Sequence, residues 1–304
     1  MACLEQLVVA LASPDGDHSL VAYAAILARL GKTAEVRFVH VADPSAPAAL
    51  LRGRMRDHVK AVFGETSASL ECDVLHGALT DRLLAHVNEF QADLIVIGSR
   101  KHRLGARLAM LAPCAVAIVP NDFEPRLSHV LVPVDFSADT VQTLEWTTAL
   151  IAGQDVRCSA LHVMTHESTD LFGGEASEAE QQEAMRRLLA GTTKHAVTVE
   201  ARLVGVTRTT DVGHSHPFSF PASIQGSDIA HTILTEATTT GVDCIAMSTR
   251  GRSRSASILL GSVTDKVIER ATVPVLVAKH RGRNLGLASI LLGRAGAQPG
   301  IRAN

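Results

Sequence analysis

The sequence predicts an α/β protein with two tandem, doubly wound domains, each built on a five-stranded parallel sheet. The chain of 304 residues is long enough for about two domains of ordinary size. Its apolar segments are continuous runs of valine, isoleucine and leucine without clean alternation, as expected for parallel strands that helices cover on both faces. The order of these segments repeats once along the chain, which indicates a tandem duplication.

The first strand and first helix have the same pattern in both halves. The run LVVALAS, which begins at Leu7, matches VLVPVDFS, which begins at Val130. A helical segment follows in each place, HSLVAYAAILARL in the first half and DTVQTLEWTTALI in the second. Each half is therefore expected to begin with a buried strand, a turn of small residues and a covering helix.

The second strands carry a histidine at the same point of the repeat. The runs VRFVHVAD and RCSALHVMT predict these strands and contain His40 and His162. Neither histidine is paired with a serine or cysteine nucleophile in a recognisable motif. We interpret both as packing residues at strand ends.

The remaining elements follow in the same order in both halves. Gly77 and Gly226 each precede a helical segment, the strands ADLIVIGSR and VDCIAMSTR come next, and AVAIVP and VPVLVAK close the halves. Each half thus has the order β-α-β-α-β-α-β-α-β. The second half carries about 27 extra residues before Gly226, which predicts an insertion. The expected parts of the chain are a domain over 1–122, a domain over 123–280 with the insertion near 205–225, and a tail over 281–304.

Composition and charge narrow the classes of function. The formal net charge is −2 and aromatic residues make up 3% of the chain, so neither nucleic acid nor an anionic membrane is favoured as a partner. The five cysteines form no C-x-x-C pair, which is typical of reduced cysteines in an intracellular protein. No basic residue precedes the first apolar run, and no run is long and apolar enough to cross a bilayer. We expect a cytoplasmic protein.

The segment STRGRSRSASILLGSVTDKV, which runs from Ser248 to Val267, combines glycine and hydroxyl residues with a helix start. Gly251 allows the backbone to approach a ligand closely. Ser262 suits a helix N-cap, with Asp265 as the acidic partner of a capping box. The free N–H groups and the dipole of such a helix start can bind a phosphate. Without further context, the same residues also describe an ordinary loop and cap.

The spacing Ser248-x-x-Gly251-x9-Gly261-Ser262 resembles the signature of the universal stress protein family, G-x2-G-x9-G-[ST], with Ser248 in place of the first glycine. The resemblance covers roughly residues 5–280 and is looser in the first half. It implies an adenine nucleotide alpha hydrolase-like fold and a tandem member of the family. It also implies an internal pseudo-dimer, in which the last strands, around 116–119 and 275–277, pair across a pseudo-twofold axis. A further homodimer is compatible with it.

The resemblance also implies a nucleotide site in the second half. Asp135 matches the residue that contacts the adenine amino group, although it could equally cap the following helix, and Val163 matches a position whose backbone faces the base. The implied ligand is ATP, or ADP or AMP, with no metal beyond magnesium that accompanies the nucleotide. The other residues that match nucleotide-binding positions are Pro133, Val134, Ser248, Thr249, Gly251, Arg252, Ser253, Gly261, Ser262, Val263 and Thr264.

Two arginines in this loop leave an alternative open. Arg250 and Arg254 stand where relatives usually have histidine and glycine. They could strengthen phosphate binding, or they could fill the cleft as solvated charges. The second case would favour a scaffold or partner-binding stress protein without nucleotide.

The first half is predicted to have lost the site. The interval from Gly98 to Ala115 is about eight residues shorter than the one from Ser248 to Val273, and the Gly-Ser helix start is missing from it. No aspartate directly follows the first strand, since Asp15 belongs to a Pro-Asp-Gly turn. The sequence therefore predicts one nucleotide per chain.

Other candidate sites are weaker. His214 and His216 form an H-x-H pair that could ligate zinc, but the spacing matches no recognised zinc motif, and we expect no stoichiometric metal. The chain has no Walker lysine, H-E-x-x-H or G-x-S-x-G motif, so we assign no catalytic residue. The resemblance allows at most slow ATP hydrolysis or self-phosphorylation.

Overall fold

The structure, a computed structural model, describes residues 4–99, 102–164, 178–192, 197–206, 226–249 and 260–279. The first half contains β1 (Gln6–Leu11), α1 (His18–Gly31), β2 (Glu35–Ala42), α2 (Ala48–Phe63), β3 (Ser69–His76), α3 (Leu79–Glu89), β4 (Leu94–Gly98), α4 (His102–Leu111) and β5 (Ala115–Val119). The second half contains β6 (His129–Pro133), α5 (Ala138–Leu150), β7 (Arg157–Met164), α6 (Glu178–Thr192), β8 (Val199–Gly205), α7 (Gly226–Thr239), β9 (Cys244–Ser248), α8 (Ser262–Arg270) and β10 (Val275–Ala278). The predicted alternation of strands and helices is confirmed in both halves.

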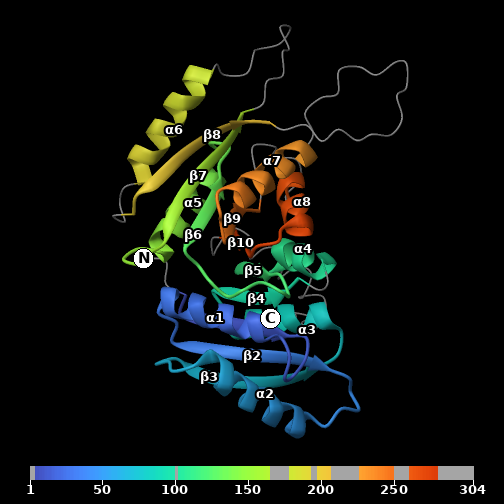
Figure 1. Ribbon diagram of the computed structural model, residues 1–304. Helices are drawn as coiled ribbons and strands as arrows, with labels where there is room; N and C mark the ends of the chain where they lie inside the picture. The colour runs from blue at the N-terminus through green and yellow to red at the C-terminus, as the bar shows by residue number, and fades with distance from the viewer. Residues whose placement is uncertain are drawn as a thin grey trace, which may run out of the picture.

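All ten of these strands form one sheet, in the order β3-β2-β1-β4-β5-β10-β9-β6-β7-β8 (Figure 1). Within each half every pairing is parallel. In both halves the chain starts in the interior of its sheet, adds strands outward on one side, and then returns to add strands on the other. This order is that of a doubly wound α/β domain, so the predicted fold class is confirmed.

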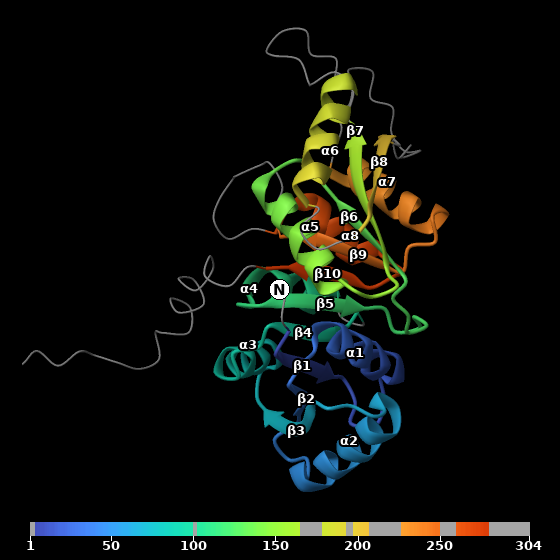
Figure 2. The same cartoon turned by 90° about the vertical axis from the view of Figure 1, so that its left-hand side faces the viewer.

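The two halves join through their last strands. β5 and β10 are antiparallel, with Val116 opposite Val277 and Ile118 opposite Val275. This confirms the pairing expected from the family resemblance, and both views show the two strands side by side at the junction (Figures 1 and 2). Helix α4 packs on α8 across the same junction, where a Cβ at Gly105 would lie 3.6 Å from a methyl carbon of Ile268.

Helices cover both faces of the sheet, and each face has its own core. One core joins residues of α1, α2, α5 and α6 to the sheet, and the other joins residues of α3, α4, α7 and α8. Both cores include residues from the two halves, such as Tyr23 with Leu144 in the first and Leu108 with Ile268 in the second. The apolar strands are buried on both sides, as their continuous hydrophobic sequences predict.

A buried carboxylate fixes the point where the chain enters the second half. The side chain of Asp243, which is fully buried, accepts hydrogen bonds from the backbone N–H groups of Ser128 and His129 and from the Ser128 hydroxyl. Arg126 Nε lies 3.7 Å from its Oδ2 atom. These donors offset the cost of burying a charge.

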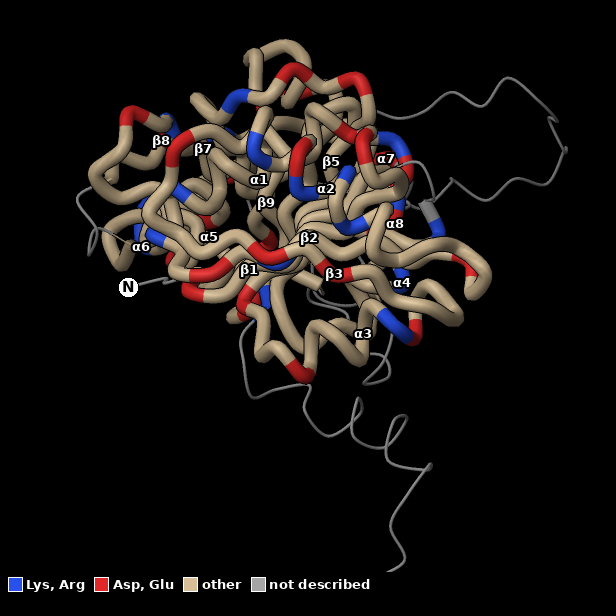
Figure 3. Tube along the Cα trace, turned by 90° about the horizontal axis from the view of Figure 1, so that it is seen from below, with Lys and Arg blue, Asp and Glu red and all other residues tan. Residues whose placement is uncertain are grey.

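Charged residues of both signs are interspersed along the described trace (Figure 3), in keeping with the formal net charge of −2. Among the described helices, none combines the length and the hydropathy that a membrane span needs.

Candidate functional site

The candidate site of the second half lies where the order of strand addition reverses. β6 has β7 on one side and β9 on the other, and all three strands are parallel. Their carboxyl ends therefore meet at the same edge of the sheet, and they carry Pro133 at the end of β6, Val163 in β7 and Ser248 at the end of β9. Ligands of doubly wound sheets bind outside the carboxyl ends of the strands at this kind of reversal.

Asp135 lies in the turn between β6 and α5. Its Oδ1 atom accepts the N–H of Ser137 at 2.9 Å and the hydroxyl of Thr140 at 3.0 Å. The N-cap of α5 is Ser137, whose hydroxyl accepts the Thr140 N–H at 3.4 Å. Asp135 therefore braces the turn but does not itself cap the helix, and two donors fix the direction of its carboxylate.

His162 holds the residues on both sides of Asp135. Its Nδ1 atom lies 2.8 Å from the carbonyl oxygen of Val134, which can only accept, so the ring donates there. Its ring centroid lies 4.4 Å from that of Phe136. On its other edge, Nε2 lies 3.1 Å from Oε1 of Gln181 in α6. His162 is buried, as expected for a packing residue at a strand end.

The start of α8 supplies the other end of the site. Its N-cap is Gly261, at which no side-chain cap is seen among the residues that the structure describes, so the prediction that Ser262 caps this helix in a box with Asp265 is wrong. Ser262 is instead the first helical residue and is exposed. A glycine at the N-cap leaves the first-turn N–H groups without a side-chain acceptor of their own helix, which is the arrangement that favours an anion.

The hydroxyl of Thr264 has a structural partner that the motif did not reveal. It is buried and donates to the carbonyl oxygen of Ser248 at 3.0 Å, which ties α8 to the end of β9. The N–H of Gly261 donates to the carbonyl oxygen of Thr249 at 2.9 Å and closes the same loop at its base. A contact from Thr264 to phosphate would therefore come from its backbone N–H.

Several predicted residues lie outside the described part of the chain. They comprise the middle of the signature loop and the histidine pair of the insertion: Arg250, Gly251, Arg252, Ser253, Arg254, His214 and His216. Within the residues that the structure describes, no group of three or more histidine, cysteine, aspartate or glutamate side chains could hold a metal ion.

The equivalent edge of the first half is built differently. Ala12 takes the place of Asp135, and its N–H donates to the carboxylate of Asp17 at 2.8 Å. Asp15 lies in the predicted turn and pairs with Arg54 of α2. Helix α4 starts at His102, close behind the end of β4 at Gly98, so no long loop separates strand and helix as it does between β9 and α8. The carboxylates of this edge therefore follow Ala12 in the chain and do not replace Asp135.

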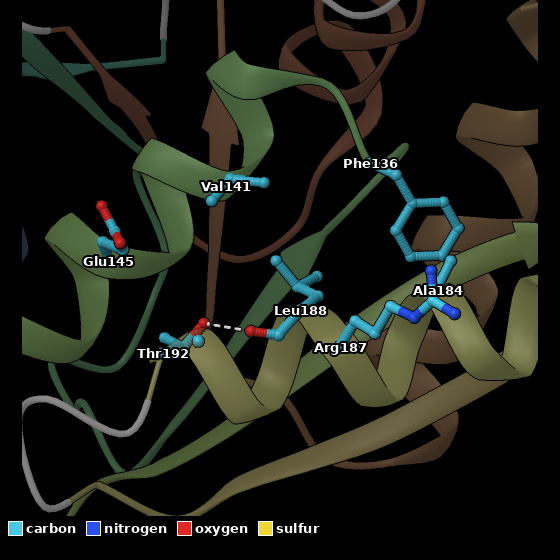
Figure 4. A pocket seen from close by; sticks show the side chains of 8 residues that line it. Phe136, Val141, Glu145, Ala184, Arg187, Leu188 and Thr192 are labelled. Atoms are coloured by element: carbon cyan, nitrogen blue, oxygen red, sulfur yellow. Dashed lines mark hydrogen bonds between the residues drawn. The ribbon is translucent and has the colours of Figure 1, made fainter.

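A separate pocket lies between α5 and α6 (Figure 4). Its volume is about 380 Å3, and its wall is mostly apolar but includes one glutamate and one arginine. It touches the candidate site only through Phe136, whose ring forms part of the wall among the pocket residues that the structure describes. The lining residues are Phe136, Val141, Glu145, Ala184, Arg187, Leu188, Gly191 and Thr192.

Comparison with known proteins places both halves in one family. The model of the Universal stress protein family matches residues 4–120 and again residues 127–279. A universal stress protein of Methanocaldococcus jannaschii is 49% identical over 41 residues, which are 14% of this chain and 25% of that protein. The matched segment is therefore about a quarter of that relative's length.

Solved structures agree with this fold along nearly the whole chain. The universal stress protein from Archaeoglobus fulgidus is 14% identical with a TM-score of 0.61, and the match covers 92% of this chain and 98% of that one. A Pseudomonas aeruginosa protein assigned to the same family is 13% identical with a TM-score of 0.66, and the match covers 95% of this chain and 98% of that one. At these identities the likeness shows the fold.

Proposed function

This chain belongs to the universal stress protein family, and from that premise we propose that it binds one ATP, or a related adenine nucleotide, in its second half. We take 1–122 and 123–280 as its two domains. In this proposal the second domain is the nucleotide-binding one, and the first is a structural partner that completes the internal pseudo-dimer. The role in the cell is a response to stress that depends on nucleotide binding.

The observation that carries the proposal is the pairing of two features at one strand-order reversal. Asp135 follows β6, and the uncapped start of α8 follows the neighbouring strand β9. A carboxylate oriented by Ser137 and Thr140 suits the amino group of adenine. A helix start with Gly261 at the N-cap suits the phosphates at the opposite end of the ligand.

The proposal assigns roles to the predicted residues. Asp135 accepts from the adenine amino group, and the backbone at Pro133, Val134 and Val163 faces the base. The phosphates and ribose are bound by the loop after β9 and by the first turn of α8. The residues of this second group are Ser248, Thr249, Gly251, Arg252, Ser253, Gly261, Ser262, Val263 and Thr264.

The first half supports a stoichiometry of one. The carboxylates of Asp15 and Asp17 lie beyond the end of β1, where a nucleotide of this family would put its base. An adenine amino group would find no acceptor in the side chain of Ala12, and the Asp17 carboxylate already accepts from the Ala12 N–H. The short connection between β4 and α4 offers no loop to enclose the phosphates.

Substituting Gly261 with valine tests the phosphate end of the site. Gly261 has φ −61° and ψ 140°, values that valine adopts without backbone strain. In this proposal the larger side chain stands beside the N–H groups that bind phosphate. We expect Gly261→Val to reduce the affinity for ATP by at least about 100-fold in isothermal titration calorimetry. Thermal unfolding should change little.

Gly53→Val is the matched control, because a Cβ at Gly53 in α2 meets nothing within 4 Å. It should leave ATP affinity unchanged. Unchanged affinity in Gly261→Val would remove α8 from the site, and failure of the wild-type chain to bind any adenine nucleotide would overturn the proposal as a whole.

A further inference from the structure

We infer that His162 is the positioning residue for adenine recognition, and that it acts by holding the turn that carries Asp135. The inference rests on the proposed function. Asp135 would contact the base itself, whereas His162 would fix the backbone immediately before and after it. This histidine sets how strongly the site distinguishes a purine with a 6-amino group from one without it.

The first contact fixes the backbone before Asp135. His162 Nδ1 donates to the carbonyl oxygen of Val134 at 2.8 Å. The N–H of Val134 is itself bound, since it donates to the carbonyl oxygen of Leu161 at 2.8 Å. Two residues of β7 therefore fix Val134, which lies one residue beyond the end of β6. The Leu161 carbonyl binds its N–H, and the His162 ring binds its carbonyl oxygen.

The second contact fixes the residue after Asp135. Phe136 has φ +63°, a left-handed conformation that residues with side chains rarely adopt, so the surroundings must hold it. Its ring lies 4.4 Å from the His162 ring, centroid to centroid. The same ring forms part of the wall of the pocket between α5 and α6 (Figure 4). The His162 ring is therefore a direct support for the backbone turn that aims Asp135.

The third contact anchors the histidine. Nε2 of His162 lies 3.1 Å from Oε1 of Gln181, a buried side chain of α6. The imidazole therefore has a polar neighbour at each nitrogen and an aromatic ring against its side. Because these contacts fix the orientation of the His162 ring, the ring restricts the movement of Val134 and Phe136, the residues that it contacts.

The equivalent histidine of the first half provides a comparison, because it makes the same hydrogen bond beside a turn without the carboxylate that would bind adenine. His40 occupies the equivalent place in β2, and its Nδ1 atom lies 3.0 Å from the carbonyl oxygen of Leu11, the equivalent of Val134. Ala12 follows Leu11, so the same bond there steadies a turn that carries no ligand-binding carboxylate. If the bond served the fold alone, removing it would have the same consequences in both halves.

The test compares two ligands on the full-length chain. ATP carries the 6-amino group, and purine riboside triphosphate lacks it. We expect His162→Leu to weaken ATP binding by about 10-fold while changing the affinity for purine riboside triphosphate by less than about 2-fold. His40→Leu should leave both affinities unchanged. His162→Asn, whose amide can reach the Val134 carbonyl, should restore most of the preference for ATP.

A double-mutant cycle identifies the route. With Asp135→Ala the preference for ATP should already be lost, and adding His162→Leu should then change it no further. Equal losses for both ligands in His162→Leu, or additive effects in the cycle, would overturn the positioning role.

The outcomes also distinguish the inference from the proposed function. If Asp135→Ala leaves the preference for ATP intact, the proposed adenine contact is wrong and the inference fails with it. If Asp135→Ala abolishes the preference but His162→Leu does not alter it, only the inference fails. Should His162→Leu not fold, Phe136→Leu removes the ring contact while leaving the His162–Val134 hydrogen bond, and it must reduce the preference in the same direction.

Discussion

Gln6 begins β1 and His129 begins β6, so the two residues occupy equivalent positions in the two halves. They show how single residues differ between the halves. The backbone N–H of each donates to a carboxylate at 3.0 Å, Gln6 to Asp93 and His129 to Asp243. The side chains differ, because His129 is buried, with Nε2 2.8 Å from the Ser159 hydroxyl. Burial lowers the pKa of the His129 imidazole below its usual value.

This shift predicts an acid sensitivity that the variant His129→Gln should reduce. Because the folded pKa is depressed, the unfolded chain takes up the proton first, and the free energy of unfolding falls as pH drops below about 6.5. Urea unfolding at pH 7.5 and at pH 5.5 measures the loss. We expect a smaller loss in His129→Gln, and an equal loss in the two proteins would show that His129 stays neutral or is charged in both states.

At the scale of elements, the junction between the halves depends on close approach of helix and strand. α4 crosses β5 at Gly105, where a Cβ would lie 3.3 Å from Cγ1 of Ile118 and 3.6 Å from Cγ2 of Ile268 in α8. The glycine therefore lets α4 lie on the strand that pairs with the other half and against a helix of the other half. A glycine inside a helix lowers helix stability, so this position trades local preference for packing.

Gly105→Leu should destabilise the protein by about 1–3 kcal/mol, because the larger side chain overpacks the contact among α4, β5 and α8. The same substitution at Gly53 in α2 is the control, since no atom lies within 4 Å of a Cβ there. Gly53→Leu should be neutral or stabilise by up to about 1 kcal/mol. Denaturant unfolding of both variants measures the difference, and equal effects would contradict the packing argument.

The elements were predictable from sequence to a large extent, and the contacts within the site much less so. Buried parallel strands require continuous apolar runs, so the strands and the repeat were visible directly. The left-handed backbone of Asp17 and Phe136 was not, because neither residue type requires a positive φ. The hydrogen bond that the Ala12 N–H donates to Asp17 and the ring contact between Phe136 and His162 each involve one of these left-handed residues.

At the start of α8, too, the sequence predicted the residue types but not all of their contacts. The motif predicted glycine and hydroxyl residues at a helix start, and the structure has them there at Gly261 and Ser262. It could not predict that Thr264 would use its hydroxyl to bond Ser248, since that contact requires β9 and α8 to be in place. Spacing identifies where a loop closes, whereas tertiary packing decides which donors remain for a ligand.

At the scale of the whole molecule, a continuous ten-stranded sheet joins two halves with the same topology and unlike strand ends. The joining strands are equivalent, and both cores extend across the junction. The strand ends are not equivalent, because the turn after β6 carries Asp135, whereas the turn after β1 has Ala12, whose N–H donates to Asp17. The central claim is therefore an asymmetric function within a symmetric fold.

Calorimetric titration of the intact chain with ATP tests this claim most directly. The account predicts saturation near one equivalent per chain, with that single binding event lost in Gly261→Val and retained in Gly53→Val. Saturation near two equivalents would show that the first half also binds nucleotide, and one equivalent retained in Gly261→Val would show that binding does not depend on the start of α8; either result would contradict an asymmetric site in the second half.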